Sequence, residues 1–235
     1  WWQTNVKGLF AVGECAGTHG IVRPGGSALN AGQVGSLRAT EYICRYPKTA
    51  DTDRFEKAYA DEKVALQKTL QDVIKNKDTA DKRIAEARRR MSDSAAAIRD
   101  PKELKAVLAQ TEHALSVCSQ EFGITDKSDY VKYQKYIDIL LTQRVMINAF
   151  LDYAKTVGGT RGSALYYAPD GALREGLSEM FRLKAEHQAA KDKIQTVTQK
   201  DGKITCTCRP VRPIPEIDGF FENVWRSFRE NGNVY

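Results

Sequence analysis

The amino-acid sequence predicts a mainly α-helical protein, in which a helical bundle domain follows a terminal strand–loop–helix segment. Two observations carry this prediction. Between residues 51 and 200, apolar residues recur at helical spacing in long runs with short connections between them. Before those runs, residues 8–46 show the order typical of the carboxyl edge of a parallel sheet: a short apolar run, a glycine-rich loop and a helix.

The first segment is predicted from glycine-bounded and small residues. The apolar run Gly8–Gly13 predicts a buried strand. A helix is predicted from Ser27 to Tyr46, because Pro47 follows its end. Its small residues share one side and let another backbone or a flat ligand approach: Ala28, Ala31, Gly32, Gly35 and Ala39.

Three amphipathic helices are predicted after this segment. The first is capped by Thr52 or Asp53 and runs towards Asp93 or beyond. The second begins at Asp100-Pro101, with proline in the first turn, and stops near residue 123. The third runs from about residue 128 to Gly158-Gly159. Short connections between such helices predict an antiparallel bundle.

The C-terminal part of the sequence is more mixed. A looser stretch at 160–169 precedes a predicted helix at 173–199. Alternation after Asp201-Gly202 predicts a short strand at 203–211. Prolines at 210, 213 and 215 then predict an extended run, and residues 220–226 a last short helix.

Composition and charge narrow the function classes. The 235 residues are 42% hydrophobic and 28% charged, as in ordinary folded domains rather than disordered chains. No apolar run approaches membrane-spanning length, so no direct membrane insertion is expected. The net charge of +6 comes from basic residues that are interleaved with acidic ones, which favours solvated helix faces. Binding of nucleic acid is therefore not expected, although it stays open as an alternative.

The cysteines and the start of the chain also carry information. Five scattered cysteines, an odd count, fit reduced thiols in a cytoplasmic protein better than a disulfide framework. Cys206 and Cys208 form the one close pair, and without further ligands nearby they are expected in a strand rather than at a metal. Because the sequence begins at Trp1 rather than Met, we expect a fragment or a processed product.

The glycine-rich opening stretch predicts a ligand site. Glu14 follows the predicted strand and can accept hydrogen bonds from sugar-like hydroxyls. The backbone N–H groups of Ala28 and Leu29 fall in the first helical turn, which suits an anion or an electron-rich carbonyl. Arg23 lies in the loop between them, and a guanidinium binds a carboxylate bidentately. The alternative is a loop that only turns the chain, with a surface arginine.

These residues carry a resemblance to a known family. Residues 6–32, VKGLFAVGECAGTHGIVRPGGSALNAG, resemble the C-terminal flavin-binding segment of the fumarate reductase, succinate dehydrogenase and L-aspartate oxidase flavoproteins. The stretch Thr160–Ser163 is similar to a Ser-Arg-Gly stretch in the helical domain of that family. Residues 209–216 and 220–229 resemble the end of some bacterial members.

The resemblance implies a domain organisation and FAD as cofactor. Residues 1–47 would be the C-terminal segment of an FAD-binding α/β domain, 51–200 a helical C-terminal domain, and 201–235 an extended tail. Glu14 would bind the ribityl chain. The helix start would face the isoalloxazine, where the amides of Ala28 and Leu29 meet its pyrimidine edge beside Ser27.

The resemblance also implies substrate contacts. Arg23 would clamp a carboxylate of the substrate over the flavin, and Gly26 would leave room for that substrate. His19 is placed with the substrate-binding residues, with a loop-shaping role as its alternative. Pro24 and the pairs Ser27-Ala28 and Asn30-Ala31 depart from the usual family residues, which leaves the identity of the substrate open.

The implied reaction is hydride transfer between flavin and a carbon–carbon bond activated by a carboxylate. The sequence contains no strand–GxGxxG–helix for the FAD pyrophosphate and no capping domain with a proton donor. We therefore expect no catalytic residue in this chain and no turnover by the chain alone. The expected partners are the N-terminal FAD-binding and capping regions, an electron-transfer subunit and a small carboxylate substrate. Alternatively, residues 51–200 are a docking module for such a subunit, without catalysis of its own.

Overall fold

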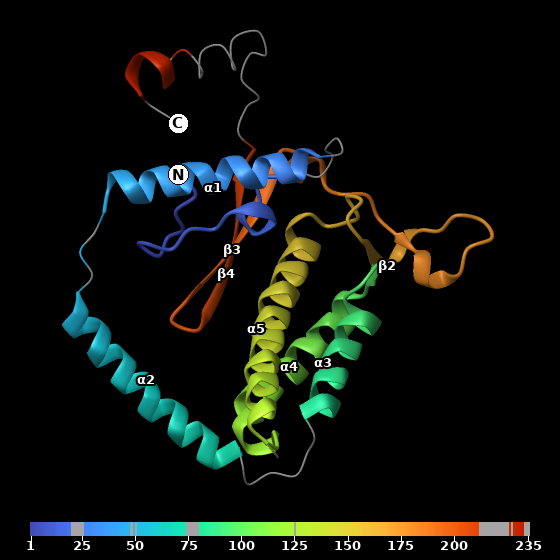
Figure 1. Ribbon diagram of the computed structural model, residues 1–235. Coiled ribbons are helices and arrows are strands. Elements are labelled where there is room, and N and C mark those ends of the chain that lie inside the picture. The colour runs from blue at the N-terminus through green and yellow to red at the C-terminus, as the bar shows by residue number, and fades with distance from the viewer. Residues whose placement is uncertain are drawn as a thin grey trace. The chain divides into compact units, whose positions relative to one another are not determined.

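The computed structural model describes residues 1–19, 26–47, 49, 51–73, 80–124, 126–211, 226 and 228–232. The chain divides into two compact units, residues 1–64 and 65–235, and each is described by itself. Helices make up most of the regular structure in both units (Figure 1), so the prediction of a mainly α protein is confirmed.

The first unit is built on one long helix, α1 (Ser27–Arg45). A short 3₁₀ turn, η1 (Gly13–Ala16), packs against α1, and a Cβ on Gly32 would lie 3.6 Å from the Cα of Gly13. The Trp2 indole covers Gly35 so closely that a Cβ there would come within 2.9 Å of its nitrogen. The small residues of α1 therefore admit a backbone and a flat ring, and the predicted helix is confirmed.

The predicted buried strand at residues 8–13 is wrong. Its backbone pairing is limited to one isolated antiparallel bridge between Phe10 and Gln3, flanked by hydrogen bonds of Leu9 and Ala11, and Leu9 is 54% exposed. Gly8 and Gly13 both adopt positive φ, at 87° and 75°, which interrupts an extended run at either end. A parallel strand also needs neighbouring strands, and the described residues of this unit contain none.

The second unit contains the predicted bundle, formed by α3 (Ala80–Ser94), α4 (Pro101–Glu121) and α5 (Lys127–Thr156). One apolar cluster joins the start of α3, the end of α4 and the start of α5. A second joins the end of α3, the start of α4 and the end of α5. Helix α4 therefore runs antiparallel to the other two (Figure 1), as predicted.

The single helix predicted from residue 52 towards 93 is described as two helices. Helix α2 (Thr52–Val73) spans the boundary between the two units, and α3 begins at Ala80. Residues 74–79 lie outside the described part of the chain.

Local capping explains where the bundle helices begin. The Asp100 side chain accepts a hydrogen bond from the Lys102 amide at 2.8 Å, and Pro101 occupies the first turn of α4. At α5, Asp126 accepts from the Ser128 amide at 2.6 Å in a capping box with Asp129.

A buried polar layer separates the two apolar clusters. Gln143 on α5 is 3% exposed, and its Nε2 donates to the Ala87 carbonyl of α3 at 2.6 Å. The Thr111 hydroxyl of α4 lies 3.4 Å from Gln143 Oε1 and donates to the Val107 carbonyl at 2.8 Å. Since buried polar groups are costly without partners, this layer fixes the axial register of the three helices.

Two small sheets complete the second unit. Strand β1 (Ile98–Arg99) pairs in parallel with β2 (Leu165–Ala172), and β3 (Lys193–Lys200) pairs antiparallel with β4 (Lys203–Pro210). The last strand confirms the one predicted at 203–211. Between β2 and β3 lie two short 3₁₀ turns, η2 (Glu179–Phe181) and η3 (Gln188–Ala190).

The predicted helix at 173–199 is wrong, and strand pairing is the reason. Leu183 bridges to both Tyr167 and Ala172, which holds the first half of the segment beside β2. The second half becomes β3, because Asp201 and Gly202 adopt positive φ, at 50° and 75°, and turn the chain into a hairpin. The predicted proline run lies largely outside the described residues. Of the helix predicted at 220–226 only Arg226 is described, and it is helical.

Candidate functional site

The structure brings together two residues of the predicted site. Glu14 lies on η1, and its side chain is 71% exposed. His19, whose side chain is 6% exposed, places Nδ1 at 2.9 Å from Glu14 Oε2. With the proton on Nδ1, the ring donates to the carboxylate and holds it in one orientation.

The second ring nitrogen of His19, Nε2, differs from Nδ1 in its surroundings. Among the described residues Nε2 finds no hydrogen-bond partner, although it is buried. A buried polar atom left unpaired costs about 1–3 kcal/mol. A polar atom of a bound molecule that reached this nitrogen would remove that cost.

Helix α1 begins at the residue that the sequence predicts, Ser27. Gly26 is the N-cap, with φ 82°, and no side chain of the described residues caps the helix there. The first helical bond is from the Asn30 amide to the Gly26 carbonyl at 3.2 Å, so the amides of Ala28 and Leu29 precede the first intrahelical bond. Partial positive charge therefore gathers at this end.

The remaining predicted contact lies outside the described part of the chain. Arg23 belongs to residues 20–25, about which the structure gives no description. Its role stays a prediction, as do the roles of the other residues assigned to ligands.

An aromatic cluster anchors the N-terminal residues to α1, and the sequence analysis missed it. The Tyr42 ring lies 5.7 Å from Trp1, 5.9 Å from Phe10 and 4.9 Å from Tyr46, between ring centroids. The Arg38 guanidinium stands over the Trp1 ring at 5.6 Å, and burial lowers its pKa. The available signal was the i, i+4 spacing of Tyr42 and Tyr46 beside an aromatic N-terminus.

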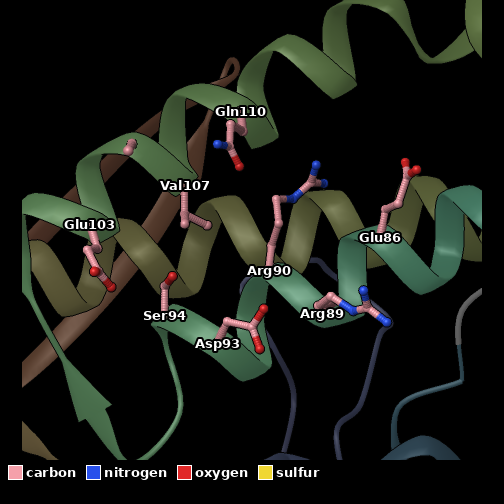
Figure 2. A pocket seen from close by; sticks show the side chains of 9 residues that line it. Glu86, Arg89, Arg90, Asp93, Ser94, Glu103, Val107 and Gln110 are labelled. Atoms are coloured by element: carbon pink, nitrogen blue, oxygen red, sulfur yellow. The ribbon is translucent and has the colours of Figure 1, made fainter.

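A polar groove of about 500 Å³ runs between α3 and α4. Figure 2 shows Arg90 rising from α3 towards α4. The groove residues carry both signs of charge: Glu86, Arg89, Arg90, Asp93, Ser94, Glu103, Ala106, Val107 and Gln110. Two arginines face three carboxylates, so the groove favours neither anions nor cations. Arg90 also lies beside Tyr136 and partly offsets the burial that raises the pKa of that tyrosine.

A more apolar groove of about 600 Å³ lies between α3 and α5. Met91, Ile139 and Met146 supply apolar contacts. Arg88, Lys135 and Asp138 bring charges to the same groove. Met146 is 41% exposed, and an exposed methionine suits adaptable apolar contacts with a protein surface.

Arg161, the arginine of the second family-like stretch, fastens the end of the bundle to the C-terminal part of the chain. It bonds the Glu186 carboxylate and the Ala190 carbonyl, and donates to the Lys193 carbonyl at 3.2 Å. Because all three acceptors belong to residues 186–193, the role of Arg161 in this structure is to hold that segment in place.

Within the described residues, no cluster of three or more His, Cys, Asp or Glu side chains could hold a metal ion. All five cysteines are free thiols. No helix of that part of the chain is both long and apolar enough to cross a membrane.

Comparison with solved structures identifies a similar fold. It occurs in a chain of a quinol-fumarate reductase solved with menaquinol molecules, with a TM-score of 0.62 and 18% sequence identity over 89% of the present chain. The match covers 35% of that chain, so the present chain spans about a third of its length. At this identity the likeness shows a shared fold. No protein-family model and no curated protein matches the sequence.

Proposed function

We propose that this chain is the C-terminal part of an FAD-dependent oxidoreductase that transfers hydride between flavin and a carboxylate-bearing substrate. The observation that carries the proposal is that an exposed carboxylate, Glu14, and a helix N-terminus that no described side chain caps belong to the same small unit. The fold shared with part of a quinol-fumarate reductase chain supports it.

In this proposal the first unit holds the cofactor. Glu14 accepts hydrogen bonds from the ribityl hydroxyls, and its contact with His19 fixes the carboxylate for that task. The amides of Ala28 and Leu29, beside Ser27, donate to the pyrimidine edge of the isoalloxazine, because they have no acceptor within the helix. The bound flavin supplies the hydride chemistry.

The substrate is held on the adjacent loop. Arg23 pairs with its carboxylate through a two-point contact. Gly26, at positive φ and without a side chain, keeps the approach to that carboxylate open. His19 lies at the start of the same loop and shapes it, since its ring is held by Glu14.

The rest of the site would come from outside these 235 residues. FAD-binding and capping regions would supply the pyrophosphate site and the proton donor. The chain spans about a third of the similar reductase chain, which supports this division. The isolated chain is then expected to be inactive.

Co-expression with an N-terminal FAD-binding and capping polypeptide tests the proposal. The complex should be yellow and should reduce fumarate or another enoate, whereas the chain alone should not. Arg23→Lys should keep the flavin but lower kcat/KM about 10- to 100-fold, because a charge-assisted bond of about 1.5–3 kcal/mol is weakened. Arg45→Lys, at the far end of α1, is the matched control. Turnover by the isolated chain, or equal activity of the two variants, would refute the proposal.

A second candidate is favoured by the apolar groove between α3 and α5. In this second candidate function, the helical domain docks an electron-transfer subunit and performs no catalysis. Met146→Lys should then abolish retention of that subunit, whereas Arg89→Lys, in the other groove, should not. Loss of flavin turnover without loss of subunit binding in Arg23→Lys would favour the first candidate.

A further inference from the structure

Two thiols share one face of the C-terminal hairpin. Cys206 and Cys208 lie two residues apart on β4, where side chains alternate between faces, so both project to the same side. Across the hairpin they pair with Val197 and Gln195. The two cysteine side chains are therefore adjacent positions on one face of the strand.

That face of the hairpin lies against α5. Cys206 Sγ is 3.8 Å from the Asn148 carbonyl, and Cys208 Sγ is 4.0 Å from the Thr156 hydroxyl. Asp152 lies between Asn148 and Thr156 on the same face of α5, and its carboxylate accepts a hydrogen bond from Gln195 Nε2 at 2.7 Å. Because both sulfur contacts are long, neither thiol makes a strong hydrogen bond. The nearby Asp152 carboxylate is hydrogen-bonded to Gln195 instead.

A disulfide between the two cysteines fits this geometry poorly. Residues two apart in an extended strand have Cα atoms about 6.6 Å apart. That separation is at the upper limit of about 6.8 Å for a disulfide.

A metal ion between the sulfurs fits better. With metal–sulfur bonds of about 2.3 Å, one ion can bridge two sulfurs that are about 4.6 Å apart. The two Cα atoms then need not come as close as a disulfide requires. Thiolates select soft ions. Zinc prefers four protein ligands, and the described residues offer no third ligand to this pair.

We propose that Cys206 and Cys208 bind one soft, two-coordinate metal ion, of which Cu⁺ is the representative, at the junction of β4 and α5. Each thiol loses its proton to solvent, two S–H bonds are replaced by two S–Cu bonds, and no atom changes oxidation state. Cys208 is exposed and admits the ion, whereas Cys206 is half-buried and shields it. This site is independent of the flavin proposal.

Anaerobic titration of the reduced full chain with Cu⁺, delivered by a chromophoric Cu⁺ chelator, tests the proposal. The wild type should remove one Cu⁺ per chain from the chelator, and Cys206→Ser, Cys206→Ala and Cys208→Ser should each lose this capacity. Cys44→Ser and Cys15→Ser, at exposed cysteines of the first unit, are matched controls and should keep it. Circular dichroism of each variant checks that it remains folded.

Two further readouts make the outcome decisive. X-ray absorption of the loaded protein should show two sulfur neighbours and no nitrogen or oxygen. An equal concentration of Zn²⁺ should leave the Cu⁺ in place, because Zn²⁺ lacks its further ligands here. Retention of Cu⁺ by Cys208→Ser, its loss from the Cys44→Ser control, or displacement by Zn²⁺ would each overturn the proposal.

Discussion

Arg99 is predicted to hold the bundle to the small parallel sheet. Its Nε donates to the Ala95 and Ala96 carbonyls at 3.1 and 3.0 Å, and its Nη1 donates to the Tyr166 hydroxyl at 3.0 Å. The guanidinium also lies 3.6 Å from the centroid of the Phe150 ring. One side chain thus joins the end of α3, strand β2 and α5.

The magnitude follows from these contacts. Arg99→Met keeps the apolar stem but removes the hydrogen bonds, each of which contributes about 0.5–1.5 kcal/mol. It also removes the contact with Phe150, which contributes about 0.5–1 kcal/mol at a partly exposed site. Because Arg99 is only half-buried, we take the low end of each range and expect the free energy of unfolding to fall by about 2–3 kcal/mol.

A double-mutant cycle with Tyr166→Phe isolates one of these bonds. In urea unfolding followed by circular dichroism, the two substitutions should couple by about 0.5–1.5 kcal/mol. Arg89→Met, on the exposed face of α3, is the control and should change stability by less than about 0.5 kcal/mol. Burial raises the pKa of Tyr166 and Arg99 opposes this, so Arg99→Met should raise the pKa further in a spectrophotometric titration. Additive effects, or an unchanged tyrosine titration, would refute the reasoning.

Three further outcomes are expected. Leu104→Ala, in the fully buried core of the bundle, should lower the free energy of unfolding by about 2–5 kcal/mol, against less than about 0.5 kcal/mol for Leu37→Ala on the exposed face of α1. Gly202→Ala should destabilise the hairpin by about 1 kcal/mol in hydrogen exchange, because its φ is 75°; unchanged exchange in β4 would contradict the turn assignment. Hydrogen bonds from Ser128 lower the pKa of Asp126, so its stabilising effect is present above the ordinary pKa and is lost as pH falls through the lowered one. Asp126→Asn keeps the cap without titrating, and its urea midpoint should depend less on acid pH than that of the wild type; parallel curves would contradict this.

The bundle could be predicted because its signals are local. Asp100-Pro101 caps and starts α4 with its own side chain and ring, and the apolar spacing along α5 persists over its whole length. The helix predicted at 173–199 is wrong because the pairing partners of this segment, β2 and β4, lie outside it. Asp201-Gly202 between two alternating runs was a usable hairpin signal for β3, and only its second strand was inferred.

The candidate site was predictable in part. The start of α1 at Ser27 follows from Gly26 before a run of small residues, and the helix begins there in the structure. The contact between Glu14 and His19 could not be foreseen, because it depends on how a glycine-rich turn folds over five residues. The apolar run before Glu14 has the composition of a buried strand, and in the described residues of its unit it finds no strand to pair with.

The most direct test of the account is the flavin content of the chain purified with its FAD-binding and capping polypeptide. Measured by flavin absorbance per complex after gel filtration, Glu14→Gln should retain much less flavin than the wild type. Glu56→Gln, the same change at another exposed glutamate on α2, should retain as much as the wild type. Equal flavin in both variants would contradict the claim that Glu14 and the start of α1 form a flavin site.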